Sequence, residues 1–347
     1  MAIVINGSGT VTGLAVGGLP DGTVDEGTLA TDSVTAAKIP ASLENTFVSG
    51  RKNMVINGAM EIAQRATSHS TEGYGSLDRM VLALSGGTAT MSQQTLSTSD
   101  RNSLGFENYL RVEASAGNNN LGIYHHLEGI NCRHLINKKA TLSFYAKGTN
   151  PNGGSFTVFP QWYNTVSGGG DNGVAQSLTI TSSWVKYSLT FDIPIPANTT
   201  INNTAYLAMA ILQPAGDTST NAWQLNITGV QLELGSTATD FEHRSYGEEL
   251  ALCQRYYYRW DASSSSYLNI CMGKAVNTTK SRGVVDYPVT MRNTPTIGSS
   301  GSFRSVDTAA NTGASVSISR ASKFNTYIQF VGTSGSNLTT GAVTEMG

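Results

Sequence analysis

The sequence predicts an all-β protein that contains an antiparallel β-sandwich and a second, smaller β domain. Charged residues make up only 13% of the 347 residues, and 37 glycines with many Ser, Thr and Asn take their place. Since globular proteins average about 25% charged residues, this composition favours strands and turns over helical bundles. Short segments of alternating apolar and polar residues recur between clusters of Gly, Asn and Ser, as is typical of half-buried strands.

Residues 51–245 are expected to form the sandwich, because aromatic residues and alternating segments begin there. The expected strands are Asn53–Ala59, Arg79–Leu84, Ala89–Gln94, Tyr109–Glu113, Leu121–Leu127, Ala140–Ala146, Ser155–Tyr163, Gln176–Ile180, Val185–Ile193, Ala205–Leu212 and Trp223–Leu234. Residues 261–347 are expected to form the smaller β domain. Its expected strands are Tyr267–Met272, Gly283–Thr290, Thr296–Ser300, Ser315–Ser319 and Tyr327–Gly332.

Residues 246–260 are predicted to form a short linking helix between the two β regions. Tyr246, Leu250, Cys253 and Tyr257 recur at helical spacing. Ser245 can cap the helix, and Glu248 stands three residues later, which is the spacing of a capping box. We also expect the charged run 240–244 to tie the last strand of the sandwich to this helix through ion pairs.

Residues 1–50 contain no aromatic residue before Phe47 and are rich in Gly, Thr and Ala, so this segment cannot bury much surface alone. Short strands or turns that intertwine with identical chains would order it. An unstructured tail is the alternative that composition by itself favours.

Composition and charge exclude several classes of function. The net charge of −2 provides no basic field to attract nucleic acid. The chain has no 18-residue apolar run, and Met1–Thr10 lacks the regions of a signal peptide, so neither membrane insertion nor classical export is expected. Three widely spaced cysteines fit assembly in a reducing cytoplasm; they are Cys132, Cys253 and Cys271.

Four segments of the sandwich region together resemble a known family. They are KNMVINGAMEIAQR (52–65), TLSFYAKG (141–148), SSWVKYSLTFDIP (182–194) and NITGVQLELGSTATDFEHRS (226–245). In this order they resemble the carbohydrate-binding jelly-roll modules of glycoside hydrolases, a variant of which occurs in bacteriophage tail fibre proteins. Four further segments look like phage fibre or structural sequences; they are YGEELALCQRYYYRW (246–260), YPVTMRNTPTI (287–297), GSGTVTGLAVGGLPDGTV (7–24) and LATDSVTAAKI (29–39).

The resemblance implies a jelly roll at 51–245 in a non-enzymatic tail fibre of a phage virion, assembled in the host bacterial cytoplasm. It implies that residues 1–50 attach to other phage tail or baseplate proteins. It also implies a homotrimer that recognises polysaccharide or lipopolysaccharide on the host surface. Two alternatives stay open: a tailspike-like polysaccharide depolymerase, and a purely structural collar or head-fibre component.

A glycan site needs flat apolar faces for the C–H surface of the sugar and polar groups for its hydroxyls. Trp162, Tyr163 and Asn164 supply both, and they precede a glycine-rich loop that contains Asp171. A second patch is expected at Tyr124 and His126, because adjacent residues of a strand face opposite sides. The alternative is that these residues are ordinary strand aromatics beside a solvated loop. Trp184 is expected to anchor the core of the sandwich rather than to stack on sugar.

No cofactor and no metal site are expected, with structural calcium as an open alternative. Glu61 aligns with an acidic residue that helps to hold calcium in related modules, but Thr228–Gln231 stands where those modules often place Asp. A zinc site is not expected, because the spacing of His125, His126, Cys132 and His134 is not that of a zinc site. No catalytic pair can be selected among the carboxylates Glu61, Asp78, Glu113, Glu128, Asp192 and Glu233.

Overall fold

The computed structural model describes residues 51–84, 86–117, 121–164, 170–213, 220–261, 269–300, 303–306, 311–332 and 343–346. In the first fifty residues it describes β1 (Val4–Ile5) and β2 (Val11–Thr12), which pair antiparallel. The chain divides into two compact units, Met1–Gly50 and Arg51–Gly347. Apart from β1 and β2, the segment expected to attach and oligomerise lies outside the described residues.

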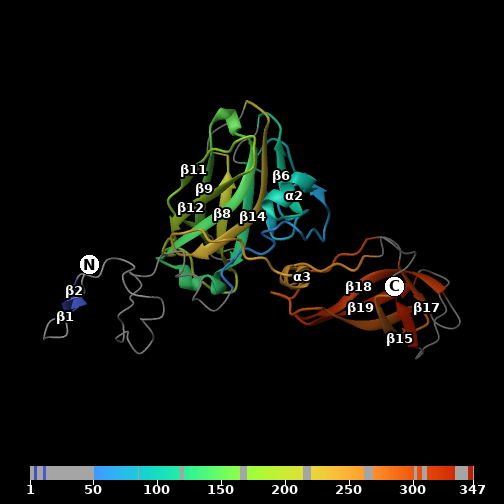
Figure 1. Cartoon of the computed structure of the whole chain (residues 1–347). Coiled ribbons are helices and arrows are strands. Elements are labelled where there is room, and N and C mark those ends of the chain that lie inside the picture. Colours follow the sequence, from blue (N-terminus) through green and yellow to red (C-terminus); the bar gives the residue numbers. More distant parts are fainter. Residues whose placement is uncertain are drawn as a thin grey trace. The chain divides into compact units, whose positions relative to one another are not determined.

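The second unit confirms the predicted all-β fold with a jelly-roll sandwich, since two antiparallel six-stranded sheets form its larger part (Figure 1). In the first sheet the order is β10-β9-β13-β7-β4, with β11 also on β9. Its strands are β4 (Met80–Ala83), β7 (Gly122–Glu128), β9 (Phe156–Asn164), β10 (Gly170–Asn172), β11 (Gln176–Leu178) and β13 (Ala205–Leu212).

In the second sheet the order is β12-β8-β14-β6-β5-β3. Its strands are β3 (Ser68–His69), β5 (Ala89–Thr95), β6 (Asn108–Ala114), β8 (Lys139–Thr149), β12 (Val185–Asp192) and β14 (Trp223–Leu234). The described helices near these sheets are short: α2 (Thr98–Leu104), η2 (Gly129–Asn131), η3 (Arg133–Leu135) and η4 (Pro151–Gly153). The strands β3 and β10 were not predicted, because two or three residues are too few to show a period.

The core of the sandwich consists of the inward side chains of both sheets. Burial alternates along β9, so that Phe156 and Trp162 point inward, and Phe144 of β8 is likewise fully buried. Aromatic side chains of this size each bury on the order of 150–250 Å², which makes them the main contributors to the core. The indole Nε1 of Trp162 donates to the carbonyl of Pro194 at 2.8 Å, so its burial leaves no unpaired donor.

A second apolar cluster covers the outer side of the second sheet. It is built on Leu96, Phe106 and Tyr109, and Trp184 packs against it. The ring of Trp184 meets Tyr109 edge-on at 5.4 Å. Trp184 therefore anchors this outer cluster, and the prediction that it anchors the central core is wrong. β14 is buried on both faces as a result, which explains why its run of residues does not alternate cleanly.

Gly229 shows why the centre of β14 carries a glycine. Its φ of 62° lies in the left-handed region, at a register shift of β14 against β8 between Thr228 and Gln231. A Cβ added there would lie 2.5 Å from Cζ of Phe106. The chain can place Phe106 over this strand only because no side chain stands at position 229.

The segment expected as a first strand, Asn53–Ala59, contains no strand. Specific hydrogen bonds hold its polar groups. The side-chain oxygen of Asn53 accepts from the backbone NH of Val55 at 2.9 Å and from that of Leu232 at 3.2 Å. Asn57 has a φ of 63°, which a strand residue does not adopt. The segment is therefore an ordered turn fixed by contacts distant in sequence, which no local pattern encodes.

The predicted linking helix is present as α3 (Tyr246–Gln254), shorter than expected. The predicted capping box is confirmed, since Ser245 accepts from the NH of Glu248 and Glu248 bonds back to Ser245. The predicted apolar stripe is wrong at its start, because Tyr246 is 59% exposed while the carboxylate residue Glu249 is buried.

A buried ion pair holds α3 to the sandwich. Arg244 and Glu249 lie 3.2 Å apart, with side chains 4% and 7% exposed. Glu249 also accepts from the NH of Asn57 at 2.6 Å, and Arg244 donates to the carbonyls of Val55 and Asn53. The charged run before the helix thus forms the ion pair that the sequence predicts. Both side chains of this pair are buried.

The C-terminal β domain is a closed barrel in the order β15-β16-β19-β18-β17-β20. Its strands are β15 (Cys271–Asn277), β16 (Lys280–Asp286), β17 (Phe303–Val306), β18 (Asn311–Ala321), β19 (Asn325–Gly332) and β20 (Val343–Met346). Val285, Ile328 and Phe330 form its small core. The strand expected at Thr296–Ser300 is absent, and β17 and β20 were not predicted.

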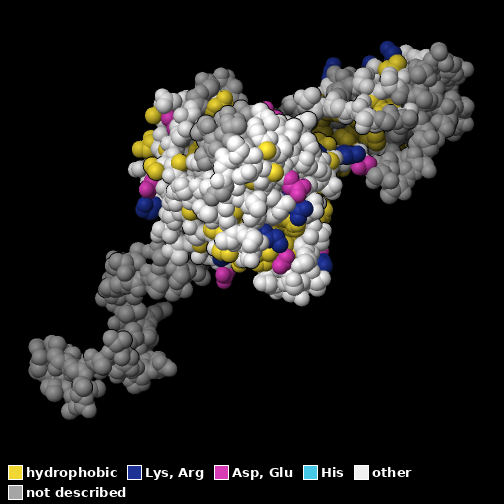
Figure 2. Space-filling view, turned by 90° about the horizontal axis from the view of Figure 1, so that it is seen from above, with side chains coloured by type: hydrophobic (Ala, Val, Ile, Leu, Met, Phe, Trp, Pro, Cys, Tyr) yellow, Lys and Arg dark blue, Asp and Glu magenta, His cyan; other side chains and the backbone are white. Residues whose placement is uncertain are grey.

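Charged groups are sparse on the surface as well as in the sequence. Figure 2 shows a face on which uncharged polar side chains and backbone predominate, with isolated basic and acidic residues between them. Among the described residues, no helix has the length and apolar character needed to cross a membrane.

We expect Glu249→Ala to destabilise the sandwich by about 3–5 kcal/mol, because it leaves Arg244 buried without its ionic partner. Urea unfolding of the full chain, followed by tryptophan fluorescence, measures the change. The neighbouring Glu248→Ala is the matched control, since the side chain of Glu248 is 50% exposed and its removal leaves no buried charge. Equal losses in the two variants would contradict the assigned role of the buried pair.

Candidate functional site

The outward side of the first sheet carries a row of aromatic side chains. Cross-strand pairing places Tyr206 of β13 opposite Tyr163 of β9 and opposite Glu128 of β7. Opposite residues in an antiparallel sheet share a face, so these three side chains project outward together.

Two alanines of β13 separate the larger outward side chains. The next two outward rows place Ala208 between Gln161 and His126, and Ala210 between Phe159 and Tyr124. Both alanines are almost fully buried although they face outward. Their larger neighbours therefore stand above them on either side.

The rings form one continuous group, called here the aromatic strip: Tyr163, Tyr206, His126, Tyr124 and Tyr74. The rings of His126 and Tyr206 stack with centroids 4.2 Å apart, and Tyr163 lies 5.4 Å from Tyr206. Tyr124 and Tyr74 lie 5.9 Å and 6.1 Å from His126. Because each ring braces the next, the strip presents a surface with few rotamers left to order on binding.

The polar edges of the strip are held in place. The hydroxyl of Tyr74 lies 3.0 Å from Nδ1 of His126, and the backbone carbonyl of His126 accepts from Arg79. Burial lowers the pKa of His126 to about 3, and the nearby charges of Arg79 and Arg292 act in the same direction. Burial raises the pKa of Tyr206 to about 12, with smaller contributions from neighbouring tyrosines. His126 and Tyr206 are therefore uncharged at neutral pH, and the strip offers apolar faces edged by hydroxyl and imidazole groups.

Three of the six predicted binding residues lie in structural positions. Trp162 is fully buried in the core, Asn164 is 1% exposed, and Asp171 is 8% exposed. The amide of Asn164 donates to the carbonyl of Thr200 at 2.8 Å. Asp171 accepts from the NH of Asn198 at 3.0 Å. Desolvation alone would raise the pKa of Asp171, but this hydrogen bond and others to the same carboxylate outweigh it and lower the pKa. Residues 165–169 of the glycine-rich loop are outside the described residues.

The other three predicted residues, Tyr163, Tyr124 and His126, come together on the strip. His125 points inward and accepts from the NH of Ile56 at 3.3 Å, so His126 is the outward histidine of the pair. Sequence reasoning missed Tyr206 and Tyr74. Tyr206 precedes Ala208 and Ala210 in a run that is apolar on both faces, so local alternation alone could not assign it outward.

Glu61 is partly buried, and its pKa is raised by burial and by the nearby Glu249. Among the described side chains, no three His, Cys, Asp or Glu residues gather as they would to hold a metal ion. Structural calcium at Glu61 thus stays a prediction from the resemblance.

No protein-family model matches this chain. A search of curated proteins found no match either. Among solved structures, the chain is similar to the enzymatically active domain of tailspike protein 4 of bacteriophage CBA120. That match has 13% identity and a TM-score of 0.35, and it covers 53% of this chain but only 21% of the tailspike chain.

Two carbohydrate-binding modules also match this chain. One is described as family 4, with 19% identity, a TM-score of 0.28, and coverage of 45% of this chain and 95% of the module. The other is the family 11 module of the cellulosomal cellulase Lic26A-Cel5E of Clostridium thermocellum. It has 12% identity, a TM-score of 0.31, and coverage of 51% of this chain and 98% of the module.

The pKa shifts of two neighbouring histidines in β7 indicate how the stability of the fold depends on pH. Burial lowers the pKa of both His125 and His126 in the folded protein. The unfolded chain therefore binds more protons below about pH 6.5, and the free energy of unfolding falls as pH drops from 6.5 towards 5. Each histidine contributes a slope of at most about 1.4 kcal/mol per pH unit.

Urea unfolding of the full chain between pH 7 and pH 5 measures this slope. We expect His126→Gln to reduce it, whatever its effect on stability at pH 7. His134→Gln is the matched control, because it removes a histidine whose side chain is exposed. An equal change of slope in the two variants would contradict the role of burial. A slope that His126→Gln does not alter would show that the ring of His126 is protonated equally in both states.

Proposed function

We propose that this chain is a structural fibre protein of a bacteriophage virion, which adheres to glycans of the host surface through the aromatic strip. The observation that carries the proposal is the strip itself: four aromatic rings on one face of a rigid sheet, joined by Tyr74 at the edge. Flat apolar faces with few polar groups are the surface that a sugar ring requires.

The phage assignment is supported by the resemblance of the segments 7–24, 29–39, 246–260 and 287–297 to phage fibre and structural sequences. On this proposal residues 1–50 attach to tail or baseplate proteins, and the chain is assembled in the bacterial cytoplasm and then resides in the virion. A homotrimer would carry three strips. Several weak sugar contacts on one fibre then combine by effective concentration, so the avidity exceeds the affinity of one strip.

The environment of Glu128 supports adhesion rather than hydrolysis. Glu128 projects outward beside Tyr206 of the strip. Arg255 and the hydroxyl of Tyr256 donate to its carboxylate at 2.8 Å and 2.7 Å. Burial alone would raise the pKa of Glu128, but these hydrogen bonds outweigh it and hold the pKa below its usual value. A glycosidase needs a carboxyl that stays protonated near neutral pH to donate to the leaving group.

We expect Tyr206→Ala to abolish most of the glycan binding of the full chain, because Tyr206 joins Tyr163 to His126 in the centre of the strip. Loss of one stacked ring should weaken binding by about 1–2 kcal/mol, or roughly tenfold. A glycan array identifies the ligand, and titration calorimetry measures the affinity. The purified chain should also release no new reducing ends from host polysaccharide.

The matched control is Tyr327→Ala, which removes a tyrosine that is 45% exposed on β19 of the barrel. It should bind glycan as the unaltered chain does. Equal loss in both variants would rule out the strip as the binding surface. Absence of binding across a broad array would favour a purely structural collar or head-fibre component, and release of reducing ends would favour a depolymerase.

Light scattering of the purified full chain should give the mass of three chains. The physical reason is that residues 1–50 have too few apolar groups to fold alone and would be ordered by their copies. A monomer that remains folded at micromolar concentration would contradict the fibre proposal.

A further inference from the structure

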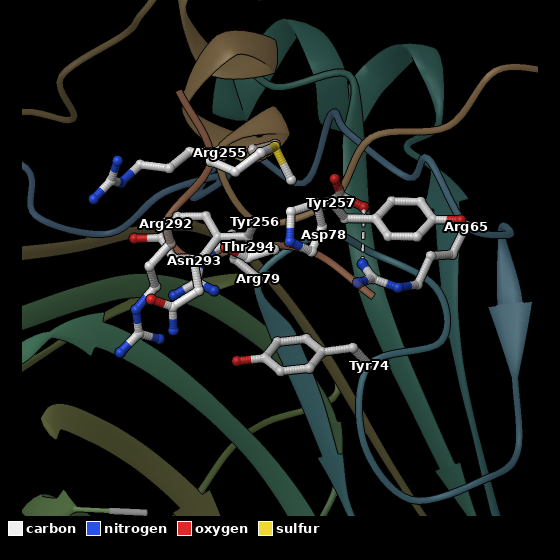
Figure 3. A pocket seen from close by; sticks show the side chains of 13 residues that line it. Arg65, Tyr74, Asp78, Arg79, Arg255, Tyr256, Tyr257, Arg292, Asn293 and Thr294 are labelled. Carbon is white, nitrogen blue, oxygen red and sulfur yellow. Dashed lines mark ion pairs between the residues drawn. The ribbon is translucent and has the colours of Figure 1, made fainter. Parts of the chain in front are cut away.

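A pocket of about 240 Å³ lies at the edge of the aromatic strip and is rich in arginine. Figure 3 shows Arg65, Arg79, Arg255 and Arg292 around it, together with Tyr74 and Asp78. The backbone NH of Arg292 donates to the carbonyl of Arg255 at 2.9 Å, which joins the segment around residue 292 to the end of α3.

The pocket carries more positive than negative charge. Asp78 is the carboxylate in its lining, and Glu128 lies beside it, bound to Arg255. Four guanidinium groups against these two carboxylates leave an excess of two positive charges. Arg65 pairs with Asp78 at 3.8 Å, which is long for an ion pair, and its guanidinium lies 3.7 Å from the ring centre of Tyr257.

Arg79 and Arg292 have donors that the protein does not use. Arg79 is only 5% exposed, and its Nε has no hydrogen-bond partner. Its guanidinium stacks on Tyr256 at 3.5 Å and donates to the carbonyl of His126. The Nε of Arg292 is also unpartnered, while its Nη2 donates to the carbonyl of Asn203 at 2.9 Å. A buried donor without a partner costs free energy, so the protein keeps these two guanidinium groups at the pocket at a cost to its stability.

The pocket and the strip share their border. Tyr74 lines the pocket and bonds through its hydroxyl to His126, and Arg79 lines the pocket and holds the backbone of His126. The strip and the pocket thus meet at Tyr74 and Arg79.

We propose that this pocket binds one anionic group, a carboxylate or a phosphate, of an acidic glycan whose neutral part lies on the aromatic strip. The inference rests on the proposed glycan binding and adds the chemical class of the ligand. The planar fork of arginine matches the oxygens of both anions. At about 240 Å³ the pocket is below the usual size of a ligand site, so it accommodates one charged group or sugar residue rather than an oligosaccharide.

The test is titration calorimetry of the full chain with four probes. They are a glucuronate-containing oligosaccharide, the same oligosaccharide with its carboxyl reduced to an alcohol, a phosphorylated counterpart, and inorganic phosphate. We expect at least one of the two acidic oligosaccharides to bind roughly tenfold or more tightly than the reduced one, because hydrogen bonds to a charged group are the stronger kind. That advantage should shrink as salt is added.

Arg292→Gln should remove most of the preference for the acidic oligosaccharide while leaving the reduced one bound as before. Arg79→Lys should also lower the preference, but it is not expected to leave the binding of the reduced oligosaccharide unchanged, because Arg79 holds the backbone of His126. Arg133→Gln is the matched control. Arg133 is exposed and likewise donates to a backbone carbonyl, that of Ile201 at 2.6 Å, but it does not line the pocket. It should keep the full preference. Arg292→Gln alters a partly exposed residue, so it remains informative even if Arg79→Lys fails to fold.

The outcomes separate this inference from the proposed function. Preference for the glucuronate or for the phosphorylated probe supports the inference and identifies the anion. Equal binding of acidic and reduced probes, lost in Tyr206→Ala, overturns the anion pocket and leaves adhesion through the strip. Binding of phosphate without binding of any oligosaccharide overturns the glycan assignment as well as the proposed function.

Discussion

The register in which β13 pairs with β7 and β9 determines the face on which any ligand would bind. A strand has a period of two, so a slip of one residue would turn Tyr206 into the core and bring Leu207 to the surface. The inward side chains prevent this slip. Leu207 is fully buried, and Trp162 opposite it on β9 fills the core and bonds to Pro194. The packing of the inward side chains thus fixes which side chains face outward, because inward and outward residues alternate along the same strand.

The same constraint explains what the sequence could and could not predict. β13 and β14 were predicted with the bounds that the structure has, because long apolar runs between turn residues are strong signals. Trp162, Tyr163 and Asn164 were predicted to act together, yet a strand turns alternate residues to opposite faces. Only Tyr163 points outward. The pairing of β9 with β13 decides whether Tyr163 or its two neighbours face outward, and no local sequence pattern contains that pairing. Tyr206 escaped prediction for the same reason, whereas Tyr74 lies between β3 and β4, where no strand period applies.

Contacts between residues far apart in sequence account for the remaining differences. The segment 53–59 has strand-like composition, but Asn53 bonds to β14 and Asn57 to α3 and to the carbonyls of Ile62 and Asp78. A carboxylate such as that of Glu249 is rarely buried, yet it lies buried beside Arg244. This chain has few charged residues, and several of them are buried. Each buried charge needs an opposite charge or a hydrogen-bond partner.

The closed barrel has a consequence for how copies of the chain can associate. Each of its six strands pairs with a neighbour on both sides, so the described part of the barrel has no open edge strand, although β18 pairs with β17 only over residues 311–314. A closed strand order offers no edge strand to which identical chains could add one strand after another. Contacts between barrels are therefore expected to involve side chains such as those of Met272 and Val276, which are 67% and 44% exposed. Such contacts are set by shape and chemistry, so they can stop at a fixed number of subunits instead of growing into an aggregate.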